Sequence, residues 1–529
     1  MNDTPVLFAE CAKVPPATGT AARRWQIPAL SLAKALTLAG VSGVAYATSL
    51  PPLSWSIAAW IALVPLFVAC AALTPARAAL AGLCWTATMA AGVAWCLPSM
   101  LSGYFGLGAM PTAIASLAIG GVHGACIAAY AAWAAWLVRR EKASPILLAG
   151  GWLVCEFALA QAGLTGPWAL AAYTQVHWTP LIQIADLAGP YGIGLLIAAV
   201  NALAAGSFVT ALRGRRVTLS AAAIAAAVAG TLIYGEWRIA QTFGDGPPVA
   251  VRIVQGGASP LRRDARAARL ARYVALATRD SGPRPRLIVW PEHAIDAYLE
   301  EASPTRDLVL HTAAAMDADL LLGGPHYAPT PSGTRYHNSV YLVRHGRLAE
   351  RYDKHRLVPF AEDDRLAWLR GEDRTSYAAG DGSFVLPTDA LRVGALLCVE
   401  AMHPELPREA VSQGADVLVN LSNDAWFGHA APARHQLDIA TLRAVEARRY
   451  LVRAASTGIS AVIDPHGKTV EQTDFDSHQV LNASVRASHS RSPYHRFGDV
   501  FAWTVTAAVA GATLRAAARS GRTDRRRSP

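Results

Sequence analysis

The hydrophobic and polar positions divide the chain into an apolar half and a half with the pattern of a soluble domain. Residues from about 27 to 240 are nearly free of acidic and basic side chains, whereas 248–496 have an ordinary charge content. The change falls near residues 244–248, which read Gly-Asp-Gly-Pro-Pro. Because Gly and Pro interrupt regular structure, we expect a domain boundary there.

Apolar stretches in the first half, and one near the C-terminus, have the length of roughly 20 residues that a helix needs to cross a bilayer. Short Lys and Arg clusters occupy alternate connecting loops and both terminal segments, as in cytoplasmic loops. We therefore expect both termini in the cytoplasm, with no signal-peptide cleavage after the first stretch. The expected spans are 29–49, 54–73, 79–99, 110–138, 145–164, 189–212, 217–235 and 498–516.

This topology predicts five parts. They are a cytoplasmic N-terminal segment at 1–28, a transmembrane helical domain at 29–240, an extracytoplasmic domain at 248–495, a C-terminal transmembrane helix at 498–516 and a basic cytoplasmic tail at 517–529. Such a chain would be a multi-pass membrane protein with its large domain on the extracytoplasmic side.

Composition supports the membrane assignment and argues against nucleic-acid binding. Of the 529 residues 53% are hydrophobic and 16% charged, against about 25% charged in a typical soluble protein. The net charge of +10 comes from short basic clusters between apolar spans and in the tail, not from one basic face. A buried helical core of a soluble protein is the alternative reading of 27–240, and the alternating basic loops disfavour it.

Residues 248–495 alternate short Val-, Ile- and Leu-rich runs with helical patterns, which is typical of an α/β domain. The expected strands are 249–255, 287–291, 320–323, 339–343, 395–398 and 417–420, and the expected helices are 260–278, 305–316, 403–413 and 435–450.

Three chemically capable residues stand at the ends of extended segments in this domain, where α/β folds place functional groups. Glu292 follows Ile288–Pro291, Lys354 follows a segment ending in Tyr352-Asp353, and Cys398 ends Gly394–Leu397. Cys398 is the one cysteine of residues 248–495, so it has no disulfide partner within the domain. A solitary thiol in an oxidising compartment is either an inert packing residue or a nucleophile.

The three residue types suit nucleophilic catalysis. A thiol at its ordinary pKa is mostly protonated at neutral pH and needs an adjacent base, which a carboxylate can provide. An ammonium group can stabilise the oxyanion of a tetrahedral intermediate. Taken singly, each residue also has an ordinary interpretation: Glu292 as a helix cap, Lys354 as a solvated charge and Cys398 as a core residue.

Longer motifs around these residues support the catalytic interpretation. Trp290-Pro291-Glu292, the segment 354–362 (Lys-His-Arg-Leu-Val-Pro-Phe-Ala-Glu) and Cys398-Val399-Glu400 resemble the three signature segments of the nitrilase superfamily. Together with 420–428, 443–446 and 458–467, and with 180–187 and Tyr191-Gly192 in the membrane half, they resemble bacterial apolipoprotein N-acyltransferases. The resemblance covers the chain from about residue 29 to 516.

The resemblance implies a multi-span α-helical membrane domain joined to a nitrilase-type αββα sandwich. It implies Glu292 as general base, Lys354 as oxyanion stabiliser and Cys398 as nucleophile, with Glu362 and Glu400 supporting them. The implied enzyme is a monomer that needs no metal or cofactor, and it lies in the bacterial inner membrane with its catalytic domain in the periplasm. It takes an acyl chain from a phospholipid onto the cysteine as a thioester, and passes it to the α-amine of a lipoprotein's diacylglyceryl-cysteine.

The sequence also allows other interpretations. Trp426 and Phe427 are expected either to line the acyl site or to belong to the domain core. The chain departs from the family pattern in segment 256–262, and at Val399, where the family usually has Tyr. A paralogue acylating a different amine, a membrane-bound amidase or deacylase of the same superfamily, and a transporter or scaffold with a degenerate domain are the alternatives.

Overall fold

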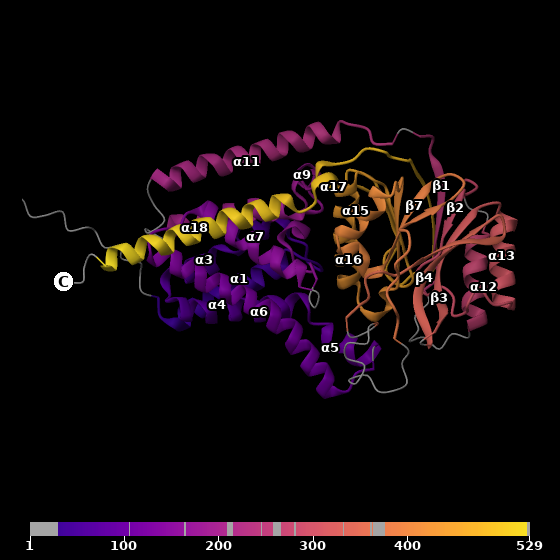
Figure 1. The fold of residues 1–529 in the computed structure, drawn as a ribbon, viewed down its shortest axis with the longest axis horizontal. Coiled ribbons are helices and arrows are strands. Elements are labelled where there is room, and N and C mark those ends of the chain that lie inside the picture. The colour runs from indigo at the N-terminus through magenta and orange to yellow at the C-terminus, as the bar shows by residue number, and fades with distance from the viewer. Residues whose placement is uncertain are drawn as a thin grey trace, which may run out of the picture.

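The computed structural model describes residues 30–525, apart from residues 105, 163–165, 209–214, 245, 258–265, 280–281, 332, 360–361 and 363–375. The expected N-terminal segment at 1–28 lies outside the described residues, as do 258–262 and the end of the basic tail at 526–529. A bundle of helices and an α/β domain lie side by side, and the long helices α11 and α18 run along the bundle (Figure 1).

Apolar helices stand at each position where the sequence predicts a membrane span. The structural elements of this part are α1 (Leu32–Thr48), η1 (Ser56–Ala58), α2 (Ala59–Ala62), α3 (Val64–Ala72), α4 (Pro75–Val93), α5 (Leu97–Ser99), η2 (Met100–Tyr104), α6 (Ala109–Arg139), α7 (Pro145–Gln161), η3 (Ala171–Gln175), α8 (Thr179–Ile182), α9 (Ala185–Ala188), α10 (Pro190–Phe208), α11 (Arg215–Ile239) and α18 (Val500–Arg525).

Not all of these helices are long enough to cross a bilayer individually. Among the described residues four helices are both long and apolar enough: α6, α10, Thr218–Ile239 of α11 and Val500–Ala518 of α18. A bent pair, Pro75–Val93 with Leu97–Gly103, makes a fifth candidate, and α1, Ser56–Ala72 and α7 are shorter apolar helices. A membrane domain of several apolar helices is confirmed, while the full set of crossings stays a prediction.

The segment expected as one span at 79–99 is broken. Helix α4 ends at Val93, and Leu97–Gly103 continues at an angle of 61° to it. Pro98 lies in the new helical segment and lacks the N–H that a continuous helix would need. The break carries the chain toward the α/β domain, where the ring of Trp95 lies 4.4 Å from that of His429.

The α/β domain has four layers, which confirms the αββα sandwich that the family resemblance implies. One six-stranded sheet has the order β12-β1-β2-β3-β4-β5 and the other β11-β10-β9-β8-β7-β6. Helices α12 and α13 cover the outer face of the first sheet, and α15 and α16 cover the second on the side of the membrane helices (Figure 1). Val, Ile and Leu side chains of both sheets form the core between them.

The strands are β1 (Val249–Gln255), β2 (Leu287–Val289), β3 (Asp319–Thr330), β4 (Gly333–Arg344), β5 (Arg347–Asp353), β6 (Val385–Pro387), β7 (Arg392–Leu397), β8 (Val417–Ser422), β9 (Leu451–Ala455), β10 (Ala461–Ile463), β11 (Thr469–Gln472) and β12 (Gln479–Val485). The helices are α12 (Arg266–Ala277), α13 (Pro304–Met316), η6 (Cys398–Met402), α15 (Glu405–Ser412), η7 (Asp424–Trp426), α16 (Ala430–Ala447) and α17 (Pro493–Phe497).

A buried ion cluster and an apolar contact join the two bodies. Ile439, Leu442 and Val445 of α16 belong to the same apolar cluster as the membrane helices. The buried carboxylate of Asp186 in α9 accepts hydrogen bonds from Arg448 at 2.7 Å and from Tyr234 at 2.7 Å. Arg238 of α11 lies 3.0 Å from the same carboxylate. These contacts fix the face of the α/β domain that the membrane helices cover.

Candidate active site

The fold brings together the three residues that the sequence singles out. Glu292 follows β2 and Lys354 follows β5 in the first sheet, and Cys398 follows β7 in the second. The Lys354 ammonium lies 3.3 Å from Oε1 of Glu292, and the Cys398 thiol lies within electrostatic range of both groups. All three side chains are buried. The packing of the two sheets therefore collects them at one point.

Glu362 belongs to the same cluster through hydrogen bonds to Lys354 and Asn338. Lys354 donates a hydrogen bond to its carboxylate at 2.9 Å, and the backbone N–H of Val358 donates to Oε2 at 2.8 Å. The side-chain amide of Asn338 donates to Glu292 at 2.8 Å and to Glu362 at 3.0 Å. The ammonium group is thus held between two carboxylates whose orientations are fixed by other donors.

Glu400 ties the Lys354 loop to the cysteine strand. Its carboxylate is fully buried and accepts backbone N–H groups from His355 at 2.7 Å, Arg356 at 2.9 Å and Leu397 at 2.7 Å. The Tyr352 hydroxyl donates to it at 2.7 Å. Glu400 is therefore placed to position the two loops, not to exchange protons with a ligand.

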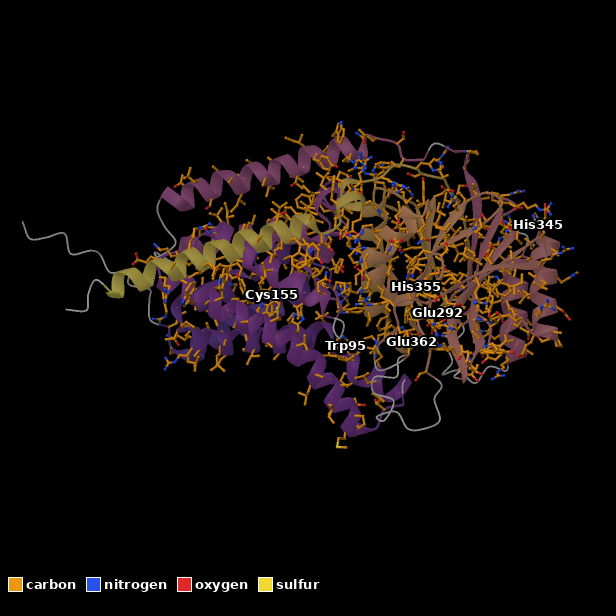
Figure 2. All side chains as sticks on the ribbon, in the orientation of Figure 1. Trp95, Cys155, Glu292, His345, His355 and Glu362 are labelled. Carbon is orange, nitrogen blue, oxygen red and sulfur yellow. The ribbon has the colours of Figure 1, made fainter. Side chains whose placement is uncertain are left out.

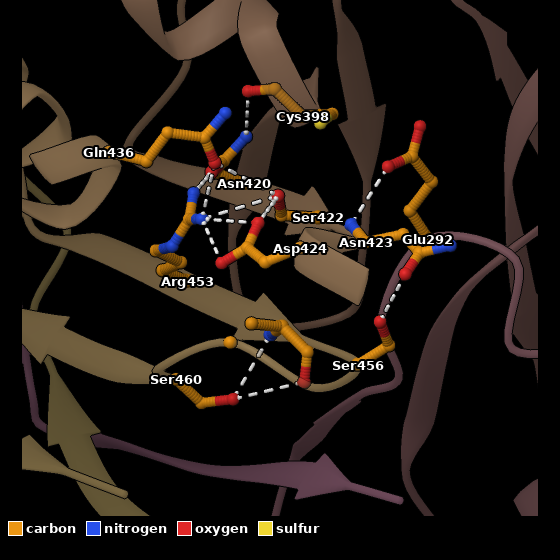
Figure 3. A network of polar contacts seen from close by, with 12 residues as sticks. Glu292, Cys398, Asn420, Ser422, Asn423, Asp424, Gln436, Arg453, Ser456 and Ser460 are labelled. Atoms are coloured by element: carbon orange, nitrogen blue, oxygen red, sulfur yellow. Dashed lines mark hydrogen bonds and ion pairs between the residues drawn. The ribbon is translucent and has the colours of Figure 1, made fainter. Parts of the chain in front are cut away.

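Cys398 stands on a constrained turn. Its φ of +51° lies in the left-handed region, which is uncommon for residues other than glycine and frequent at functional sites. The side chain of Asn420 donates to the Cys398 carbonyl at 3.2 Å, and Asn420 itself accepts from Arg453. The Asn420 contact, drawn in Figure 3, holds the turn that carries the thiol.

Arg453 is the centre of the network beneath this turn. Its guanidinium is fully buried and forms an ion pair with the buried carboxylate of Asp424 at 2.8 Å. It also donates to Gln436 at 2.8 Å and to the Ser422 hydroxyl at 3.2 Å. Figure 3 shows these side chains converging from different elements below Cys398.

Burial and neighbouring charges set the protonation states of the cluster. Burial and the Glu292 carboxylate raise the pKa of the Cys398 thiol well above its ordinary value, although Lys354 opposes them. Burial by itself would raise the pKa of Glu292. The charge of Lys354 and the hydrogen-bond donors have the larger effect, so the pKa of Glu292 is lowered. Burial also opposes the charge on Lys354, and the carboxylates of Glu362 and Glu292 raise its pKa nonetheless. The resting site therefore holds a thiol, a carboxylate and an ammonium group.

This arrangement can carry out acyl chemistry. A carboxylate beside a neutral thiol can take its proton as the sulfur attacks a carbonyl carbon. A buried ammonium group can stabilise the negative charge that then develops on the carbonyl oxygen. Backbone N–H groups hold the other carboxylate oxygens, so the groups need little rearrangement during the reaction.

A cavity of about 360 Å³ lies between the membrane helices and the α/β domain. Its walls come from α4, the bent segment after it and α6 on one side, and from residues near the site on the other. Val399, next to the cysteine, and Val358 line it, as do Trp426 and Phe427. Glu292 and Glu362 lie within the α/β domain, and Trp95 lies near the boundary between that domain and the bundle (Figure 2).

Three positioning residues were not recognised from the sequence. Asn338 joins two carboxylates but has no place among the sequence-based predictions, which also do not name Asn420 or Arg453 as supports for Cys398. Asn338 lies beside the apolar run 340–343, and Arg453 lies within the apolar strand β9. A polar residue in a buried strand needs a hydrogen-bond partner, and this rule could have identified Asn338 and Arg453 as positioning residues.

The fold and the site define a nitrilase-type domain attached to a bundle of apolar helices. Residues 250–492 match the carbon-nitrogen hydrolase family, and residues 42–203 match the apolipoprotein N-acyltransferase N-terminal domain. An apolipoprotein N-acyltransferase of Geobacter metallireducens is 33% identical and covers 91% of this chain and 94% of its own length. One of Methylococcus capsulatus is 28% identical over 90% of this chain and 95% of its own. The chain belongs to the apolipoprotein N-acyltransferase family.

Two solved structures of the nitrilase superfamily each match nearly half of this chain. Nit3 of Saccharomyces cerevisiae, a nitrilase-superfamily member, has a TM-score of 0.36 and 20% identity, covering 45% of this chain and 90% of its own. An amidase of the same superfamily from Nesterenkonia has a TM-score of 0.38 and 18% identity, covering 48% of this chain and 96% of its own.

Proposed function

We propose that this protein transfers a fatty acyl chain from a phospholipid to the α-amine of a lipoprotein's diacylglyceryl-cysteine. In the first half-reaction the Cys398 sulfur attacks the ester carbonyl of the phospholipid, and Glu292 takes the thiol proton. Lys354 stabilises the oxyanion. When the C–O ester bond breaks, the proton passes from Glu292 to the leaving oxygen. The products are a lysophospholipid and an acyl thioester on Cys398.

The second half-reaction uses the same groups. The neutral amine of the acceptor attacks the thioester carbonyl, forming a C–N bond, and Glu292 takes the proton that the nitrogen gives up. The C–S bond breaks, and that proton returns to the sulfur. The products are an N-acylated lipoprotein and the free thiol, so no oxidant, reductant or cofactor is consumed.

The observation that carries this proposal is the cavity between the membrane helices and the α/β domain, which Val399 lines beside the nucleophile. An acyl chain is apolar and resides in the bilayer, so its enzyme must bury it near the membrane surface. The large aromatic side chains of Trp426 and Phe427 and the apolar residues of α4 and α6 provide such a surface. All the catalytic groups come from one chain, in keeping with a monomer. We place the α/β domain on the periplasmic side of the inner membrane, because the basic loops favour that orientation.

Product analysis with the purified protein in detergent tests the proposal. A phospholipid with a labelled acyl chain and a lipopeptide with a free α-amine should give labelled N-acylated peptide and lysophospholipid. Cys398→Ala should abolish both products, while Cys84→Ala, which changes a free cysteine of α4 outside the cavity lining, should retain them. Labelled fatty acid without acylated peptide would show a hydrolase instead, and normal transfer by Cys398→Ala would refute the mechanism.

The site also suggests one alternative function, in which the acceptor is a different amine. Val399, where the family usually has Tyr, lines the cavity beside the nucleophile and leaves more room there. A member of the family acylating a different amine would form the thioester from phospholipid normally. It would then leave the lipopeptide unmodified and release its acyl chain only to another amine.

A further inference from the structure

The charge pattern of the cavity points to a specific recognition group for the acyl donor. The described residues that line the cavity are almost all apolar, and none of them is Asp, Glu or Lys. Arg356 is the one side chain among them with a permanent charge. Arg356 lies two residues after Lys354, and it lines the same cavity as Val399, the residue after the nucleophile.

No protein carboxylate compensates this charge within the described part of the chain. The carboxylates around the site already have partners: Glu292 and Glu362 hold Lys354, and Glu400 holds backbone N–H groups. No described carboxylate pairs with the Arg356 guanidinium, which is half-buried. A partly buried charge without a partner is costly, so a negative group that enters with the ligand would be bound favourably.

Two other basic side chains, Arg443 and His403, do not bring a free positive charge to the cavity. Arg443 is fully buried and pairs with Glu446 at 2.7 Å, away from the cavity lining. His403 lines the cavity, and burial together with Arg356 and Arg443 lowers the pKa of its imidazole to about 3. At neutral pH His403 is therefore uncharged and can offer a neutral hydrogen-bond donor beside Arg356.

The backbone of Arg356 is fixed relative to the nucleophile. Its N–H donates at 2.9 Å to the carboxylate of Glu400, and the same carboxylate accepts from the N–H of Leu397, the residue before the cysteine, at 2.7 Å. One buried carboxylate thus spans the two loops. In a phospholipid only a short glycerol backbone separates the phosphodiester from the ester carbonyls, so a site near the thiol can hold both.

We propose that Arg356, assisted by His403, binds the phosphodiester of the phospholipid and thereby places an ester carbonyl at Cys398. A guanidinium group suits this role because its planar donors match two phosphate oxygens. The inference rests on the proposed function and deepens it. The diacylglyceryl acceptor has no phosphodiester, so Arg356 serves the first half-reaction and not the second.

The test measures the two half-reactions separately with Arg356→Gln. Thioester formation from phosphatidylethanolamine and from phosphatidylglycerol is followed by intact-protein mass spectrometry. We expect a loss of roughly ten- to hundred-fold with both donors, the effect of removing a hydrogen bond to a charged group. Arg356→Lys should recover part of the rate, because it keeps the charge without the planar fork. Arg347→Gln, an exposed arginine on β5, is the matched control and should react normally.

A donor without phosphate shows whether the effect comes from recognition. The p-nitrophenyl ester of the same fatty acid should acylate Cys398 equally fast in Arg356→Gln and in the unchanged protein. Transfer from the preformed thioester to the lipopeptide should also be unaffected. Equal loss with the phosphate-free ester, a loss confined to the second half-reaction, or an unaltered rate with both phospholipids would overturn the inference. If the unchanged protein forms no thioester from phospholipid, the proposed function itself fails.

Discussion

Replacing Glu292 by Gln tests the assignment of the general base. Both oxygens of the Glu292 carboxylate accept hydrogen bonds: Oε1 from Asn338 at 2.8 Å and Lys354 at 3.3 Å, and Oε2 from the N–H of Asn423 at 2.8 Å. An amide keeps one acceptor oxygen, so in either orientation its NH₂ group faces a donor. A buried donor left unsatisfied costs about 1–3 kcal/mol, less than the total stability of about 5–15 kcal/mol usual for a protein domain.

We therefore expect Glu292→Gln to fold and to lose its catalytic rate. Removing a general base slows a reaction by roughly 10²- to 10⁴-fold, and Cys398 needs the base because its own pKa is raised. The assay follows acyl-Cys398 by intact-protein mass spectrometry during incubation with phospholipid. Thermal unfolding in the same detergent reports the fold.

Glu350→Gln is the matched control, because Glu350 is an exposed carboxylate on β5. It should form the thioester at the normal rate. Folded Glu292→Gln protein that acylates Cys398 as fast as the control would refute the reasoning. In that case another group must take the thiol proton.

Three further predictions concern pH, the network under the nucleophile and the domain boundary. The rate of thioester formation should be nearly independent of pH around neutrality and fall only as the pH drops through the lowered pKa of Glu292. A rate of thioester formation that rises in proportion to the hydroxide concentration would instead show that a free thiolate reacts. By linkage, ion pairing of Glu292 should stabilise the fold above the ordinary carboxylate pKa, and acid unfolding curves should show its loss as the pH falls. Arg453→Met leaves the buried Asp424 unpaired and should destabilise the domain by about 3–5 kcal/mol, and combining it with Asp424→Asn should restore part of the thermal stability. Asp186→Asn removes the carboxylate that holds two arginines at the boundary, so hydrogen exchange in α16 should accelerate while that in β1 stays unchanged.

The structure also defines what the departures from the family pattern affect. Val399 lines the cavity next to the nucleophile, so its consequences concern the bound chain or the acceptor. The residues 258–262 lie outside the described part of the chain, and their effect stays a prediction. The cluster of Glu292, Lys354 and Cys398 is built independently of both places.

Much of the architecture could be predicted from local pattern. Runs of apolar residues gave the helices of the membrane half, and β-branched runs bounded by turn residues gave strands such as 249–255, which the structure reproduces to the residue. Those signals are local, because hydrogen bonding along a helix and alternation along a strand repeat within a few residues. The break after Val93 was missed, although Pro98 was visible, because proline alone does not tell whether a membrane helix bends.

The sequence by itself determined the two-part organisation, the fold class and three candidate reactive side chains at strand ends. Only the tertiary structure decided which groups meet. Glu292 contacts an amide 46 positions away, an ammonium group 62 positions away and a backbone N–H 131 positions away. Such contacts depend on how two sheets pack and on how α16 docks against the membrane helices, which no short-range periodicity encodes. The cavity and the placement of Arg356 on its wall exist for the same reason, since each is a property of surfaces brought together from distant parts of the chain.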